Sequence, residues 1–163
     1  MNILILGHMR HGKTTMADML NNNYALTYMD SSEAAAEIFI YDELKDKYGY
    51  KSFEECLKDR KQHRPEWYDL ICDYNSPDKS KLAKEILKRV NIYVGMRSND
   101  ELQKCVEENL FDLTIGIYRS VFPLEPKTSF DINIWESCDF IIPNDGTLDD
   151  LNNKIQKLIK LFI

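Results

Sequence analysis

Short apolar runs alternate with segments of helical period along most of the chain. The first run, residues 2–6, stops at Gly7, and four others follow at residues 24–29, 91–94, 111–118 and 139–142. Strand-length runs that alternate with helices are typical of a parallel sheet covered by helices on both faces. We therefore expect an α/β fold, a doubly wound five-stranded parallel sheet, formed by a single domain over residues 1–163.

Helix start signals lie between the expected strands. A capping box or an N-cap followed by proline marks such a start. The sequence offers four of these signals: Asp30 with Glu33, Ser76 with Pro77, Ser98 with Glu101, and Thr147 with Asp150. Residues 52–75 are polar, of helical character and too long for a plain connection. We expect a helical insertion over about residues 50–76.

Composition narrows the class of protein. A formal net charge of -6 argues against a nucleic-acid binder, which would show a basic excess. The four cysteines form no C-x-x-C pair, so neither a zinc site nor a disulfide scaffold is expected. No apolar run approaches the ~18 residues of a membrane span, and the N-terminus does not read as a signal peptide. We expect a soluble, cytoplasmic protein without a membrane partner; its oligomeric state is left open, with a homodimer as one alternative.

One motif carries chemistry. Residues 7–15 read GHMRHGKTT and match the P-loop pattern GxxxxGK[ST] at every fixed position. Gly7 and Gly12 allow main-chain N–H groups to converge on phosphate oxygens. Lys13 would reach the β- and γ-phosphates, and the Thr14 hydroxyl would ligate Mg²⁺. Because an apolar strand precedes the motif and a helical segment follows it, the sequence predicts a site for ATP with Mg²⁺.

The remaining side chains of the loop have less specific roles. Two histidines on so tight a loop, His8 and His11, would compete with the phosphates if they bound a metal. We expect them to flank the nucleotide instead, together with Thr15. Arg10 would reach the γ-phosphate or the second substrate.

Three segments together resemble a known family. They are the P-loop, YVGMR at residues 93–97, and IPNDGT at residues 142–147. With them the chain resembles nucleoside monophosphate kinases, most closely the small bacteriophage-type deoxynucleoside monophosphate kinases. The resemblance spans nearly the whole chain, and its P-loop is the specific part. It implies a central P-loop strand, a helical acceptor-binding segment, a short lid over about residues 119–131, and ATP-dependent phosphorylation of a (deoxy)nucleoside monophosphate.

The resemblance also implies roles for individual residues. Arg97 falls where such kinases hold the acceptor monophosphate; the alternative is a surface arginine that pairs with Glu101. Asn144 and Gly146 match the loop beside the adenine of ATP, although a turn and a helix cap would explain them too. Arg119 sits where a lid arginine would clamp the transferred phosphoryl group.

The acceptor site has candidates of its own in the expected insertion. Four cations crowd into residues 58–64, ahead of Trp67 and Tyr68. Cations suit a phosphate, and an aromatic face can stack on a base. Arg60 and Arg64, which lie nearest to Trp67, are therefore the expected pair, with Trp67 as the stacking ring. The alternative is a solvated basic helix face with Trp67 in the core.

The sequence shows no acid after the expected third strand, where many P-loop enzymes anchor Mg²⁺; Gly95 follows it instead. Asp30, at the end of the second strand, is the candidate substitute: it would order the hydrated Mg²⁺ or bind the acceptor, and the alternative is that it only caps the helix that starts at Ser31. A phosphate-oxygen nucleophile is already ionised, so Lys13, Arg97, Arg119 and Asp30 suffice as catalytic groups.

Two other functions remain open. A small-metabolite or nucleoside kinase would use Asp30 as a base for a hydroxyl acceptor. A nucleotide-binding switch would hydrolyse a nucleoside triphosphate slowly, although the absence of an N-K-x-D motif weighs against a GTPase.

Overall fold

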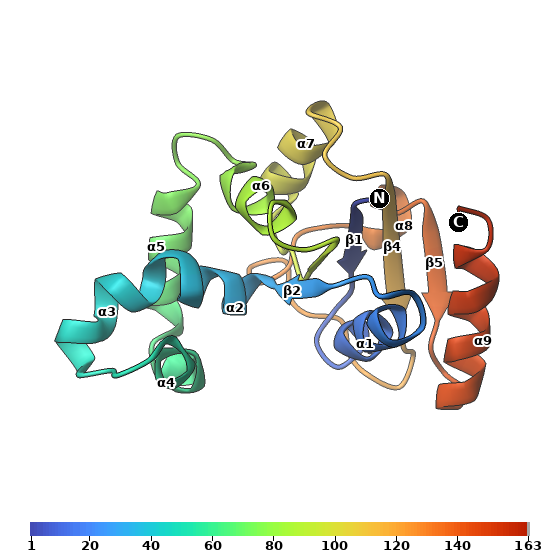
Figure 1. The fold of residues 1–163 in the computed structure, drawn as a ribbon, viewed down its shortest axis with the longest axis horizontal. Helices are drawn as coiled ribbons and strands as arrows, with labels where there is room; N and C mark the ends of the chain where they lie inside the picture. Colours follow the sequence, from blue (N-terminus) through green and yellow to red (C-terminus); the bar gives the residue numbers. More distant parts are fainter. Residues whose placement is uncertain (163) are drawn as a thin grey trace.

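A five-stranded parallel sheet forms the centre of the fold, as the computed structural model, which describes residues 1–162, shows (Figure 1). Its order is β2-β3-β1-β4-β5. The strands are β1 (Ile3–Leu6), β2 (Tyr28–Asp30), β3 (Ile92–Val94), β4 (Leu113–Tyr118) and β5 (Phe140–Pro143). The strand that leads into the P-loop, β1, pairs with β3 on one side and β4 on the other. The expected doubly wound α/β sheet with a central P-loop strand is confirmed.

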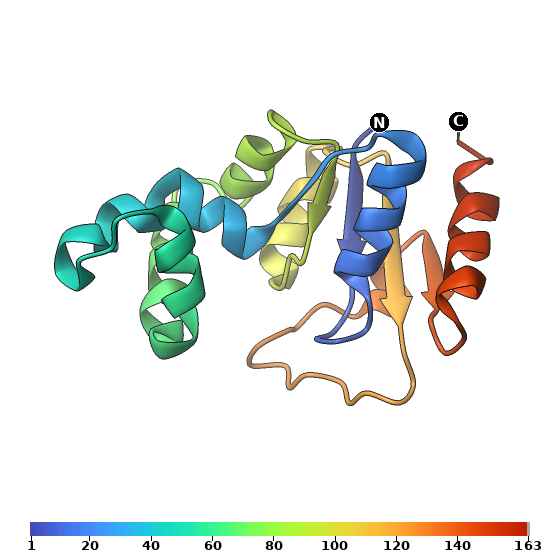
Figure 2. The ribbon, with the colours of Figure 1, turned by 60° about the horizontal axis from the view of Figure 1, so that its bottom comes forward.

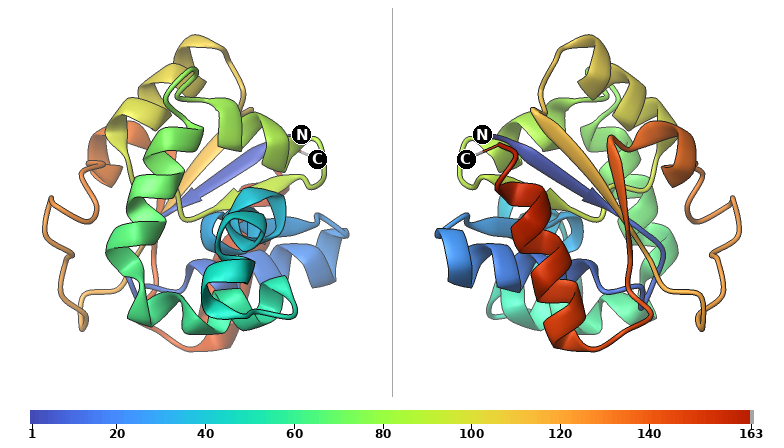
Figure 3. Two further views of the ribbon diagram at one scale, coloured as in Figure 1. Left: turned by 90° about the vertical axis from the view of Figure 1, so that its left-hand side faces the viewer. Right: turned by 90° about the vertical axis from the view of Figure 1, so that its right-hand side faces the viewer.

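Helices cover both faces of this sheet (Figure 3). One face packs against α1 (Lys13–Tyr24) and α9 (Leu148–Ile159), and the other against α6 (Lys81–Leu87), α7 (Asn99–Glu107) and the short α8 (Ile134–Ser137). Ile3 and Ile5 of β1 enter the first core, whereas Leu4 and Leu6 enter the second. Because both faces are buried, β1 reads as a continuous apolar run rather than an alternating one.

A helical arm, residues 31–74, projects beyond the β2 edge of the sheet (Figure 1). It runs through α2 (Ser31–Ala35), the π-helical turn η1 (Ala36–Ile40), α3 (Tyr41–Tyr48), α4 (Phe53–Asp59), the 3-10 turn η2 (Arg60–Gln62) and α5 (Arg64–Tyr74). The arm has a small core of its own, to which Ala36, Ile40 and Trp67 belong. The helical insertion was expected over residues 50–76, but the helical arm starts earlier, at residue 31. The reason is that the helix that Asp30 caps continues through residues 31–48.

Two expected boundaries inside the domain are wrong. The second strand begins at Tyr28 instead of residue 24, because α1 extends to Tyr24 and ends at Ala25, whose φ of 55° is left-handed. Ser76 and Pro77 do not start α6. The Asp78 carboxylate accepts hydrogen bonds from the amide and hydroxyl of Ser80, which fixes a turn and delays the helix.

One of the expected capping boxes forms in the structure, and another does not. Thr147 and Asp150 form the expected box at the start of α9. Ser98 is the N-cap of α7 but makes no side-chain capping bond, and Glu101 accepts a hydrogen bond from Asn75 instead.

A loop without helix or strand, the lid loop (residues 119–133), connects β4 to α8 and passes below the sheet in Figure 2. It lies at the carboxyl ends of the parallel strands, where ligands bind in doubly wound sheets. The segment expected as the lid, about residues 119–131, falls within it.

Candidate functional site

The P-loop curls tightly between β1 and α1. A Cβ at Gly12 would lie 2.4 Å from Asn144 Nδ2, and one at Gly7 would lie 2.6 Å from the Ile117 carbonyl oxygen. Gly12 also has a φ of 108°, which side chains disfavour. Asn144 Nδ2 donates to the His11 carbonyl at 3.0 Å and so fixes the curl from outside. Gly7 is therefore required by the close approach of the β4 backbone, and Gly12 by its left-handed φ and by the Asn144 side chain packed against it.

A cavity of about 470 Å³ opens beside this loop. It is lined by Arg10, Gly12, Lys13, Thr14, Thr15, Arg119, Asn144, Gly146 and Leu148. All but Leu148 were named from the sequence. Leu148 is 65% exposed and offers an apolar surface next to Gly146, where a base could rest. The structure thus brings the expected donor residues together around one cavity.

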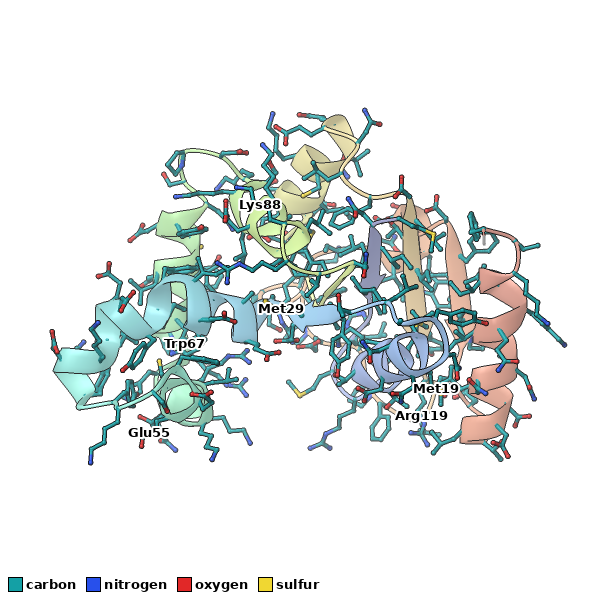
Figure 4. The ribbon with its side chains drawn as sticks, in the orientation of Figure 1. Met19, Met29, Glu55, Trp67, Lys88 and Arg119 are labelled. Carbon is teal, nitrogen blue, oxygen red and sulfur yellow. The ribbon has the colours of Figure 1, made fainter. Side chains whose placement is uncertain are left out.

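Arg119 reaches this cavity from the start of the lid loop. Its Nε is buried and has no hydrogen-bond partner within residues 1–162, while its guanidinium lies 5.3 Å from the Phe122 ring centroid. Figure 4 shows Arg119 near α1, well away from Trp67 in the arm. A buried donor without a partner is costly, so a small shift of this side chain toward a phosphate in the cavity that it lines would be favourable.

Lys13 lies half-buried at the floor of the site. Its Nζ donates to the His8 carbonyl at 2.9 Å. Burial, with the charge of Arg97 acting in the same direction, lowers the pKa of Lys13 to about 8. The loop therefore holds this lysine partly uncharged near pH 8, and an anion beside it would raise the pKa.

Triphosphate binding is expected to take up protons at pH 8. About half of the Lys13 side chains are neutral there, so binding should consume up to about half a proton per site. Above pH 8 the affinity should fall with increasing pH, and below pH 7 the uptake should vanish. Calorimetry in two buffers of different ionisation enthalpy measures this uptake; equal heats in both buffers at pH 8 would contradict the linkage.

The two histidines of the loop turn inward rather than toward the nucleotide. His11 is fully buried; its Nδ1 accepts from the Arg119 amide at 3.1 Å, and its Nε2 lies 3.3 Å from the Pro123 carbonyl, which it bonds as a donor. His8 Nδ1 accepts from the Glu125 amide at 2.9 Å. The expectation that His8 and His11 flank the nucleotide is therefore wrong for their side chains, which fasten the lid loop to the P-loop.

Glu125 also joins the lid loop to the P-loop, and no motif in the sequence pointed to this residue. Its carboxylate accepts from the Met9 amide at 2.8 Å and from Arg97 Nη1 at 2.6 Å. Burial works to raise the pKa of Glu125, but the hydrogen bond and charge of Arg97 prevail and the pKa is lowered. An anionic side chain thus occupies a position between a P-loop amide and Arg97. The alternative pairing of Arg97 with Glu101 does not occur.

Asp30 serves two purposes. Its Oδ1 accepts from the Ser32 amide at 2.8 Å and caps α2. Its Oδ2 lies beside Gly95, where an added Cβ would be 3.1 Å from Oδ2 and 4.0 Å from Lys13 Cε. The register pairs Asp30 with Val94, the last residue of β3. Gly95 leaves the space that this carboxylate enters, so β2 supplies an acid next to the end of β3.

Arg60 lies close enough to Asp30, Arg97 and Arg64 for their charges to act on it. The pKa of Arg60 is lowered mainly by burial, with further contributions from the nearby charges of Arg97 and Arg64, and Asp30 opposes the shift. Trp67 does not join them as a stacking ring. It is 2% exposed and packs in the core of the arm, with the Arg60 guanidinium 5.9 Å from its ring centroid. The expectation that Trp67 stacks on a base is wrong.

Two other features are absent from residues 1–162. No group of three or more histidine, cysteine, aspartate or glutamate side chains there is placed to hold a metal. No helix in the same range has the length and apolar character to cross a bilayer.

Solved structures share this fold over nearly the whole chain. Dephospho-CoA kinase from Campylobacter jejuni has a TM-score of 0.58 and 17% identity, covering 98% of this chain and 96% of that one. The chain has the P-loop kinase fold. Shikimate kinase from Acinetobacter baumannii, solved with shikimate, has a TM-score of 0.53 and 16% identity, covering 98% and 93%. Shikimate kinase from Bacteroides thetaiotaomicron has a TM-score of 0.51 and 13% identity, covering 98% of each chain.

Comparisons with family models and with curated proteins do not assign the chain to a family. No family model matches the chain, and no curated protein sequence matches it. At identities of 13–17% the structural likeness shows the fold alone, and it gives no support to the narrower resemblance to bacteriophage-type enzymes.

Proposed function

We propose that the protein transfers a phosphoryl group from ATP to a (deoxy)nucleoside monophosphate and releases the diphosphate. The observation that carries this proposal is the arrangement around Lys13. A donor cavity with the P-loop lies on one side, and Asp30 with Arg60, Arg64 and Arg97 lies on the other. Phosphoryl transfer requires mainly such positioning and charge neutralisation.

The donor side fits a nucleoside triphosphate. The tight P-loop curl depends on its glycines, because a side chain at either position would clash with neighbouring residues. Arg119 carries a buried Nε without a partner. We assign the phosphates to the loop amides, Lys13 and Arg119, and the adenine to the surface of Asn144, Gly146 and Leu148. Thr14 would ligate Mg²⁺, with Asp30 accepting from its bound water. The ion would neutralise charge that develops on the transferred group.

The acceptor side fits a phosphorylated substrate better than a neutral one. The pKa of Arg60 is lowered mainly by burial and further by the charges of Arg97 and Arg64, and the opposing charge of Asp30 does not cancel this shift. A monophosphate dianion would compensate this charge by bidentate hydrogen bonds. Its oxygen is an ionised nucleophile, so no catalytic base is needed.

A second candidate function is a kinase for a small metabolite with a hydroxyl acceptor. The open Oδ2 of Asp30 beside Gly95 favours it, because a hydroxyl nucleophile requires a base at this place. Two of the structural neighbours are named as shikimate kinases and one as a dephospho-CoA kinase. A nucleotide-binding switch is a third possibility, which would show no acceptor dependence.

The test is a panel of acceptors assayed for ATP-dependent product formation. Nucleoside and deoxynucleoside monophosphates form one arm, and nucleosides and small hydroxyl metabolites form the other. Diphosphate formation confined to the first arm supports the proposal. Turnover only in the second arm replaces it with the metabolite kinase, and slow ADP release without any acceptor dependence replaces it with the switch.

Arg97→Ala is expected to raise the KM for the monophosphate about 10- to 100-fold, the effect of losing a charged hydrogen bond. The KM for ATP should change little. Because Arg97 also pairs with Glu125, the matched control is Glu125→Ala, which breaks the same ion pair but leaves the arginine. If both variants raise the KM equally, Arg97 acts by holding the lid loop and not by binding the acceptor.

A further inference from the structure

A second cavity, of about 210 Å³, lies between α5 of the arm and the part of the core formed by α6, β3 and the start of α7. Its walls are largely apolar and come from different elements: Tyr68 and Ile71 from α5, Leu82 from α6, and Tyr93 from β3. Cavities that are mostly apolar and hold a few converging polar groups are typical of small-molecule sites.

Polar and charged side chains also line this cavity: Ser31, Asn75, Lys79, Arg97, Ser98, Asp100 and Glu101. Among them, Glu101 and Asn75 are joined by a hydrogen bond. Asn75 is 1% exposed; its Nδ2 donates to Glu101 Oε1 at 2.9 Å and its Oδ1 accepts from the Leu82 amide at 3.1 Å. Both ends of this amide are therefore fixed, and it holds the carboxyl of Glu101 in one orientation. Oε2 of Glu101 accepts no hydrogen bond from residues 1–162, so one oxygen remains open to a ligand.

The cavity adjoins the acceptor site described above. Ser31, Gly95 and Arg97 line it, and Ser31 Oγ donates to the Gly95 carbonyl at 3.2 Å. A molecule whose phosphate lies near Arg97 could therefore extend its other end between Tyr68 and Tyr93. Aromatic walls with one buried hydrogen-bonding group suit a flat heterocycle that carries N–H groups on its edge.

We propose that this cavity binds the base of the acceptor nucleotide and that Glu101 is the residue that selects the base. The inference rests on the proposed function. Burial raises the pKa of Glu101 to about 7, although the Asn75 hydrogen bond opposes this shift. Above pH 7 the ionised carboxyl accepts hydrogen bonds from ring and exocyclic N–H groups, and a guanine edge presents both.

Glu101→Gln is expected to lower kcat/KM for the preferred base about 10- to 100-fold, because an amide replaces an acceptor by a donor. The loss should be much smaller for bases with other edges, so the order of preference changes, and the KM for ATP should stay within about twofold. The matched control is Glu107→Gln, an exposed glutamate on the same helix. It should leave every value unchanged.

A second measurement is independent of turnover. Cys72 lines the cavity and is exposed, whereas Cys56 and Cys105 are buried. Burial raises the pKa of Cys138 to about 12, so its thiol reacts slowly. The preferred monophosphate should slow alkylation of Cys72 by iodoacetamide at least about threefold, and ATP alone should not.

The outcomes separate the two proposals. If monophosphates are phosphorylated but Glu101→Gln keeps the order of base preference and Cys72 is not protected, the base site is wrong and the kinase proposal stands. If the wild-type protein phosphorylates no monophosphate and none protects Cys72, both proposals fail. A changed base preference together with protection supports both.

Discussion

Lys13→Ala is expected to lower the rate of ATP-dependent phosphoryl transfer by about a thousandfold or more, the effect of removing a preorganised charge from a transferring phosphoryl group. Lys13 lines the donor cavity, and its side chain also reaches Gly95, which Asp30 Oδ2 faces. No other lysine lines that cavity, so none can take its place. Steady-state rates of diphosphate formation with the best acceptor measure the loss.

The variant should fold normally, which makes the loss interpretable. Burial disfavours the charge of Lys13, as its lowered pKa shows, so removing the ammonium is not expected to reduce stability. The thermal midpoint should therefore stay at or above that of the wild type. Lys157→Ala, an exposed position on α9, is the control. Substantial turnover by Lys13→Ala would overturn the assignment of the P-loop to phosphoryl transfer.

The P-loop part of the donor site could be predicted from the sequence because its residues are close along the chain, whereas Arg119, Asn144 and Gly146 of the same cavity were expected only from the family resemblance. The spacing of Gly7, Gly12 and Lys13 determines the loop, and the apolar run before it determines the strand. The same is true of Thr147 and Asp150, whose capping box needs only three residues of separation. Local spacing is sufficient where the backbone itself makes the site.

The connection between the P-loop and the lid loop could not be predicted. His8 and His11 accept hydrogen bonds from lid-loop amides that lie 117 and 108 positions away in the sequence, respectively. No sequence pattern in either segment predicts these contacts. Two histidines beside a phosphate motif favour a role at the nucleotide, but both rings are buried against the lid loop. Their contacts are decided by tertiary packing.

Trp67 illustrates a different limit. Cations next to an aromatic residue indicate a nucleotide site, yet the same pattern arises when a buried ring has arginines at its rim. The arm begins at Ser31 rather than near residue 50, and it therefore needs a core of its own, which Trp67 fills. The buried position of Trp67 is the alternative that the sequence left open, and the sequence alone does not decide it because it does not show how far the arm extends.

Asp30→Asn is expected to lower phosphoryl transfer to monophosphates about 10- to 100-fold and to raise the Mg²⁺ concentration needed for half-maximal rate, the usual effect of losing an outer partner of a metal site. Asn retains the cap, because its Oδ1 can accept from the Ser32 amide as Asp30 does. The change therefore removes only the charge that faces Gly95 and Lys13. Rates measured over a Mg²⁺ titration test this expectation.

The same variant decides between the two acceptor chemistries. A carboxylate that orders hydrated Mg²⁺ serves every acceptor, so its loss should reduce all rates together and added Mg²⁺ should recover part of them. A carboxylate that acts as a base serves only acceptors with a proton to lose, because a monophosphate oxygen is already ionised. Loss confined to hydroxyl acceptors, without a shift in the Mg²⁺ requirement, would therefore make Asp30 a base and the protein a metabolite kinase. Asp30→Glu, which keeps the charge but displaces it, should fall between the wild type and Asp30→Asn if the charge at this position is what matters.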